Sequence, residues 1–172
     1  LAKDLGAQGI PVGHLDVGGG LGITYKDEEP PHPDDYGAAI RKALARFPGE
    51  VLLEPGRVLV GNAGLLVTRV LYVKHSGRKT FVVVDAAMND LVRPSLYGAH
   101  HAIEPVLPPR PGAREVVCDV VGPVCESSDF LARKRRMPEP RPGDLLVVRS
   151  AGAYGFAMSS NYNARPRAAE VL

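Results

Sequence analysis

The sequence has few cysteines, little net charge and no long apolar run, and each shortage excludes a class of protein. Two cysteines, Cys118 and Cys125, among 172 residues are too few for a disulfide-stabilised scaffold. The 21 basic and 19 acidic residues leave a formal net charge of +2, which predicts binding neither to nucleic acid nor to a membrane. No apolar run approaches the roughly 20 residues that span a bilayer, and no signal peptide is visible. A cytoplasmic location is the default expectation.

Metal and RNA sites also lack their usual patterns. No Cys/His spacing is typical of zinc, and the adjacent His100 and His101 are poorly spaced for one metal ion, so no metal is expected. The basic run 133–136 has no interleaved aromatic residues on which bases could stack. We interpret this run as a solvated face or a turn.

The composition is that of a globular protein with many loops. The chain is 45% hydrophobic and has 19 glycines and 16 prolines. It has no initiator methionine and stops within an apolar run at Val171 and Leu172, so we expect a segment of a longer protein.

The first third of the chain alternates helical and strand-like patterns. The expected elements are the end of a helix at 1–8, a strand at 10–17, a helix to about residue 47 capped by Asp34 or Asp35, and a strand at 51–54. Such alternation predicts an α/β part with a parallel sheet or barrel. Functional residues then lie on loops after the strands, which is where a glycine run and a Glu-Pro-Gly-Arg segment follow.

The remainder of the chain predicts an all-β region. Short runs rich in β-branched residues are separated by Gly/Pro turns, with no long helical pattern between them. The runs are 65–74, 80–84, 101–107, 115–121 and 144–150. We therefore predict two domains, 1–62 and 63–172.

Two segments of the first domain suit a phosphate-bearing ligand. Gly18, Gly19 and Gly20 leave backbone N–H groups free to converge on an anion, although a tight turn without a ligand explains them equally well. Glu54 could pair with a protonated ring nitrogen, and Arg57 could hold a phosphate or carboxylate. A surface ion pair is the simpler explanation for the Glu-Pro-Gly-Arg segment taken alone.

Three segments of the second domain carry further candidates. If residues 90–97 form a helical turn, Arg93 and Tyr97 share a face and could bind one carboxylate; otherwise Tyr97 packs in the core and Arg93 is exposed. Cys125 follows a strand and could be a small buried residue, while Cys118 is assigned to packing. Small residues around Tyr154 allow another group to approach closely, or simply form a turn around a partly buried tyrosine.

The order of these segments is more specific than any one of them. GGGLG, EPGR, DAxMNDLxRPxLY, GPxCESxD, GAY and MxSNYNxRPR follow one another from Asp16 to Arg167. This order resembles diaminopimelate decarboxylases of the alanine-racemase-like, fold-type III class that depend on pyridoxal 5'-phosphate (PLP). The resemblance implies the C-terminal part of a PLP-binding (β/α)8 barrel followed by a β-sandwich or barrel-like domain. GGG and EPGR also occur in ornithine and arginine decarboxylases of that fold.

The resemblance also implies a role for each matching residue. The cofactor would be bound by Gly18, Gly19, Gly20, Glu54, Gly56 and Tyr154. The substrate's distal carboxylate would be bound by Arg57, Arg93 and Tyr97, and its distal ammonium by Glu126. Cys125 would place the proton that replaces CO₂. In the family, Cys125 and Glu126 come from the second subunit of a homodimer.

The substrate and the departures from the family pattern follow from the same residues. Diaminopimelate carries a second amino-acid head, which two arginines and a carboxylate complement, whereas ornithine has only a distal ammonium. Ala87 stands where the family usually has glycine, so we expect no Gly-only backbone there. The lysine that bonds to PLP would precede residue 1, and Lys74 is rejected for that role because it follows EPGR in a β-type run. The isolated chain is therefore expected to be inactive. A polyamine decarboxylase or racemase of the same fold, or a non-catalytic assembly module, remain alternatives.

Overall fold

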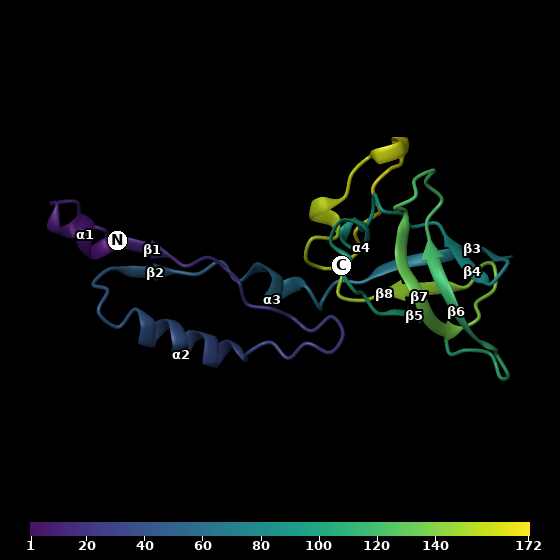
Figure 1. Ribbon diagram of the computed structural model, residues 1–172, viewed down its shortest axis with the longest axis horizontal. Helices are drawn as coiled ribbons and strands as arrows, with labels where there is room; N and C mark the ends of the chain where they lie inside the picture. Colours follow the sequence, from purple (N-terminus) through teal and green to yellow (C-terminus); the bar gives the residue numbers. More distant parts are fainter.

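The computed structural model describes all residues, 1–172. A narrow N-terminal arm, which ends with a short helix at Gly56–Val60, is joined to a rounded sheet domain, whose first strand begins at Leu66 (Figure 1). The arm holds α1 (Ala2–Ala7), β1 (His14–Asp16), α2 (Pro33–Ala43), β2 (Glu50–Leu52) and α3 (Gly56–Val60). The longest helix has 11 residues, and no helix combines the length and apolar character needed to cross a bilayer.

The two strands of the arm are parallel, as the alternating pattern predicts. Leu15 pairs with Val51, and α2 makes the connection between β1 and β2. The helix cap was wrongly predicted: His32 is the N-cap, its ring Nδ1 accepts from the backbone N–H of Asp34 at 3.3 Å, and Pro33 occupies the first turn. Proline suits this position because the first helical N–H groups have no helical partner.

The sheet domain is one six-stranded sheet that curls into a barrel-like shape, with little helix. Its elements are β3 (Leu66–Ser76), β4 (Lys79–Val84), α4 (Arg93–Tyr97), β5 (Ile103–Pro105), β6 (Glu115–Val121), β7 (Phe130–Pro138) and β8 (Leu145–Val148), followed by short 3-10 turns at Phe156–Met158 and Tyr162–Ala164. The strand order is β5-β8-β3-β4-β6-β7, and only β4 and β6 pair in parallel. The barrel-like alternative of the prediction is thus the better description.

The hydrophobic core lies almost wholly in the sheet domain. A cluster of 15 buried residues fills it, and β6 contributes alternate side chains, Val116, Cys118 and Val120, as a strand with one buried face must. Cys118 is 1% exposed, so its predicted packing role is confirmed. Burial raises the pKa of its thiol to about 11, which leaves it protonated and unreactive near neutral pH. From the arm, only Leu21 and Ile23 are buried apolar residues.

The basic run 133–136 belongs to β7, a strand that the sequence did not predict. Arg133, Lys134 and Arg136 are exposed, so the interpretation as a solvated face holds for three of the four residues. Arg135 instead turns inward: its Nη1 contacts His100 Nε2 at 2.7 Å and its Nη2 donates to the carbonyl of His101 at 2.9 Å.

Candidate functional site

The glycine loop after β1 and the Glu-Pro-Gly-Arg segment after β2 lie against each other. The backbone N–H of Val17 donates to Leu52 O at 3.1 Å, and that of Glu54 donates to Gly18 O at 3.0 Å. A Cβ on Gly19 would come within 2.4 Å of the Glu54 carbonyl oxygen, so this position accepts only glycine without a backbone shift. From α2, the Tyr36 hydroxyl donates to Gly19 O at 2.7 Å.

This junction has open space beside it. Gly18 and Gly20 have φ of +72° and +80°, and a Cβ on Gly18 would contact nothing within 4 Å. The side chain of Glu54 is exposed and that of Arg57 is half-buried, and neither forms an ion pair within the chain. The junction can therefore receive an anionic group at its backbone N–H groups, with a carboxylate and a guanidinium beside it.

The C-terminal end of α3 packs against the loop that carries Tyr154. Gly152 N donates to Gly61 O at 3.1 Å, and Ala151 N donates to Gly64 O at 2.9 Å. A Cβ on Gly152 would lie 1.9 Å from the Val60 carbonyl oxygen, so the approach needs a bare backbone. Tyr154 has φ of +61° and is half-exposed. The helix that begins at Gly56 and the Gly-Ala-Tyr loop are thereby held together.

Arg93 and Tyr97 both lie on α4, as predicted, but their surroundings differ. Arg93 is 8% exposed, whereas Tyr97 is 64% exposed, the reverse of the alternative that placed the tyrosine in the core. Arg93 Nη1 contacts His101 Nε2 at 2.9 Å, and its guanidinium lies 4.5 Å from the centre of the Tyr25 ring. Tyr25 belongs to the arm, so this cation–π contact joins the arm to the sheet domain.

Asp129 organises the loop between β6 and β7 that carries Cys125 and Glu126. Its two carboxylate oxygens accept from the backbone N–H groups of Met88 and Val124, each at 2.7 Å. Burial raises the pKa of Asp129, and these two hydrogen bonds oppose the rise. Cys125 is exposed, so it is not the small buried residue that was one alternative.

The C-terminal motif braces two of these loops. Arg165 Nε donates to Asn89 Oδ1 at 3.0 Å, and its Nη2 donates to the carbonyl of Asp85. Tyr162 Oη donates to Glu126 Oε2 at 3.4 Å. Residues between 36 and 80 positions apart thus hold one another in place.

The predicted site residues fall into two groups. The glycine loop, Glu54, Gly56 and Arg57 lie in the arm, and the loop that carries Tyr154 packs against the end of α3. Arg93 and Tyr97 on α4, and Cys125 and Glu126 on the loop between β6 and β7, lie in the sheet domain. No hydrogen bond or ion pair joins a predicted site residue of one group to one of the other. Ala87 has no positive φ, which confirms that its backbone is not restricted to glycine. Lys74 is exposed in β3 opposite Phe81, so its place in a strand is also confirmed.

Several residues of the site were not identified from the sequence. The motifs contain Asn89, Asp129 and Arg165 without indicating their roles, and the sequence places His101 only at the start of a β-type run, in a pair poorly spaced for a metal ion. Tyr25 and Tyr36 carry no local signal, because their partners lie far along the chain.

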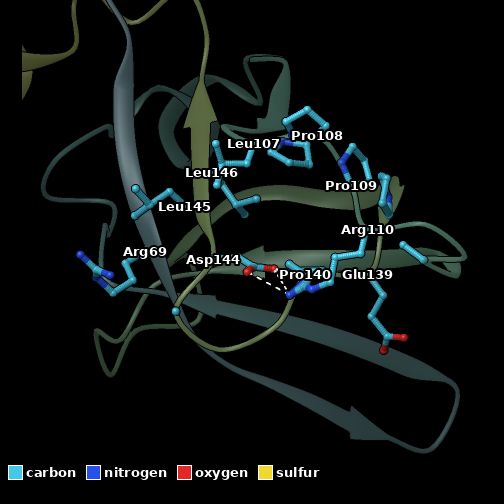
Figure 2. Close-up of a pocket in the computed structure, with 14 residues that line it drawn as sticks. Arg69, Leu107, Pro108, Pro109, Arg110, Glu139, Pro140, Asp144, Leu145 and Leu146 are labelled. Carbon is cyan, nitrogen blue, oxygen red and sulfur yellow. Dashed lines mark hydrogen bonds and ion pairs between the residues drawn. The ribbon is translucent and has the colours of Figure 1, made fainter.

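A hollow of about 330 Å³ lies elsewhere on the sheet domain, between the start of β8 and a proline-rich loop (Figure 2). Arg110 binds the Asp144 carboxylate there through both Nη atoms, at 3.0 and 3.2 Å. The charges of Arg110 and Asp144 neutralise each other, and none of the predicted site residues lines the hollow.

Comparison with known proteins gives the same family as the motifs. Residues 15–152 match the family described as pyridoxal-dependent decarboxylase, C-terminal sheet domain. The whole chain is 54% identical to diaminopimelate decarboxylase of Vibrio cholerae over 173 residues, which is 41% of that protein. The chain thus spans about two-fifths of the length of the curated relatives it matches. The predicted resemblance to diaminopimelate decarboxylases is confirmed.

Comparison with solved structures also gives decarboxylases. Diaminopimelate decarboxylase from Helicobacter pylori complexed with L-lysine matches with a TM-score of 0.88 at 47% identity, covering 96% of this chain and 41% of that one. Lysine/ornithine decarboxylase from Vibrio vulnificus complexed with cadaverine matches with a TM-score of 0.85 at 26% identity, covering 97% of this chain and 45% of that one. The chain belongs to the pyridoxal-dependent decarboxylase family and contains its C-terminal sheet domain.

Proposed function

We propose that this chain forms part of a PLP-dependent diaminopimelate decarboxylase, which converts meso-2,6-diaminopimelate to L-lysine and CO₂. The observation that carries the proposal is Arg93, a nearly buried guanidinium held on one side by His101 and Tyr25. Its Nε and Nη2 make no hydrogen bond. Neither atom is fully buried, because Tyr25 Oη is the only fully buried side-chain N or O atom without a hydrogen-bond partner. The guanidinium therefore keeps donors free for a carboxylate.

The residues of the arm fit the cofactor. Gly18, Gly19, Gly20 and Gly56 bind its phosphate, and Glu54 keeps its ring nitrogen protonated. The close backbone packing at Gly19 and the open space beside Gly18 support this assignment. When bound, PLP supplies the electron sink for the charge left by departing CO₂. Tyr154 contacts the cofactor or the substrate from the loop packed on α3.

The substrate's second head is recognised by groups of opposite charge. Arg57, Arg93 and Tyr97 bind its carboxylate, and Glu126 binds its ammonium. Each charge-assisted contact contributes roughly 1.5–3 kcal/mol, so loss of two of them discriminates strongly against ornithine. Cys125 Sγ donates the proton that takes the place of CO₂.

We also propose an architecture in which the arm is part of a barrel. Residues 1–62 form the last part of a (β/α)8 barrel and residues 63–172 the sheet domain. The proposal also includes a homodimer in which Cys125 and Glu126 complete the site of the partner subunit, and the exposure of both residues on a loop of the sheet domain supports it. A barrel would also cover the exposed apolar residues of β2, Val51 and Leu52.

A chimera tests the proposal, with this chain replacing the matching 41% of the Vibrio cholerae enzyme. We expect CO₂ release from meso-diaminopimelate and none from L-ornithine, with at least about a hundredfold loss of kcat/KM for Arg57→Ala or Glu126→Gln. Activity on ornithine alone would establish the polyamine-type alternative, and no activity on either would favour the non-catalytic one. In the isolated chain, borohydride reduction with PLP should give no stoichiometric adduct on Lys74.

A further inference from the structure

His101 is the hydrogen-bond partner of the Arg93 guanidinium. It is 0% exposed, its Nε2 lies 2.9 Å from Arg93 Nη1, and its Nδ1 lies 2.9 Å from the carbonyl oxygen of Arg149. The Tyr25 ring meets the imidazole edge-on, with ring centres 5.3 Å apart. The imidazole is thus restrained on both nitrogens and along its edge.

Hydrogen-bond chemistry determines the state of this imidazole. A guanidinium has only donors, so Nε2 must accept from Arg93. Nδ1 then carries the proton and donates to the carbonyl of Arg149, which can only accept. His101 is therefore neutral in one tautomer, and burial lowers its pKa in the same direction.

The contact with His101 occupies only Nη1 of the guanidinium and restricts the orientation of the whole group. With Nη1 on His101 and one face of the guanidinium over Tyr25, the plane of Arg93 is fixed while Nε and Nη2 remain without protein partners. A fixed plane matters because an arginine binds a carboxylate best through two parallel N–H donors.

We propose that His101 is a positioning residue that sets the plane of the Arg93 guanidinium, and thereby the affinity of the site for the substrate's distal carboxylate. This inference rests on the proposed function, because it assumes that Arg93 binds that carboxylate. Tyr25 provides the second support, and it comes from the other side of the junction between arm and sheet domain.

The test compares two ligands of the PLP-loaded chimera by calorimetry. L-Lysine keeps the carboxylate of the head that does not react, whereas cadaverine has none. We expect His101→Leu to weaken L-lysine binding about tenfold and cadaverine binding less than about twofold, since one charge-assisted contact is involved. KM for diaminopimelate should rise more than kcat falls. His101→Gln, whose carbonyl can accept from Arg93, should recover most of the L-lysine affinity.

Two further variants separate the possible failures. Met137→Ala removes a core side chain of β7 and controls for general loss of stability. If His101→Leu weakens both ligands equally, as a destabilised core does, the positioning role is wrong although the proposed function stands. If Arg93→Ala leaves the ratio of the two affinities unchanged, Arg93 does not bind the carboxylate, and both the clamp of the proposed function and the role of His101 are overturned.

Discussion

At the scale of single residues, Asp129 has a role that its exposed neighbours do not share. Its carboxylate satisfies two backbone N–H groups of two different loops. Asp129→Ala leaves both donors unpaired, so we expect a loss of about 2–4 kcal/mol in the free energy of unfolding. Urea denaturation followed by circular dichroism measures it. Ser127→Ala, in the same loop but exposed, is the matched control and should change stability by less than about 0.5 kcal/mol.

The two adjacent histidines predict how stability depends on pH. Burial is the largest cause that lowers the pKa of both His100 and His101 in the fold. Below the unfolded pKa of about 6.5, the unfolded chain binds more protons than the native one. The free energy of unfolding therefore falls as the pH falls from that value, whereas above it the contribution of the two histidines to stability is complete. The charged groups that face the pair are Arg93, Arg135, Lys26 and Glu28.

Melting temperatures measured between about pH 5.5 and 8 check this prediction. His100→Gln with His101→Gln should flatten the profile on its acid side, because the groups that gain protons on unfolding are gone. An unchanged acid slope in the double variant would assign it to other groups.

The sequence predicted the residue types of the site better than their contacts. The arginines, the carboxylates and the glycine loop were found because motifs carry them locally. The partners of Arg93 were not, because Tyr25, His101 and the Arg149 carbonyl meet only after β8 and the arm come together. No periodicity records such a tertiary contact.

At the scale of elements, the close approach of α3 and the Tyr154 loop depends on bare backbone. Gly152→Ala puts a methyl group 1.9 Å from Val60 O and 2.8 Å from Gly64 N, so the two segments must separate. We expect faster amide exchange at positions 151 and 152, whose N–H groups donate to Gly64 O and Gly61 O, and a loss of at least about 2 kcal/mol in stability. Gly13→Ala meets nothing within 4 Å and should leave exchange at these amides unchanged.

Strand β7 shows why one element of the sheet was missed. Its four consecutive cations, 133–136, do not resemble a half-buried strand, whose apolar residues alternate with polar ones. Leu131 and Ala132 are buried in succession, and Lys134 has φ of +50°, so the local pairing is irregular. Strand β6 is rich in β-branched valines, and it was predicted on that ground with its observed limits, 115–121.

At the scale of the whole molecule, the two parts differ in how well they bury apolar surface. The sheet domain has a continuous core, whereas none of the three helices of the arm has a buried residue. β1 and β2 form a two-stranded parallel sheet, and such a sheet leaves unpaired backbone groups on its outer edges. Parallel strands are usually covered on both faces, so this arm is adapted to further protein that packs against it.

The isolated chain should therefore associate with itself. Leu52 and Leu53 are 47% and 44% exposed beside an open edge, and apolar surface removed from water contributes about 25 cal/mol per Å². Sedimentation velocity at micromolar concentration should give species larger than a monomer, and Leu52→Glu with Leu53→Glu should reduce them. Leu107→Glu removes a more exposed leucine, 75%, from the sheet domain and should leave association unchanged. A monomeric chain would mean that the arm is stable in water with its edges open. An equal reduction of association by the arm substitutions and by Leu107→Glu would mean that the contact is not confined to the arm.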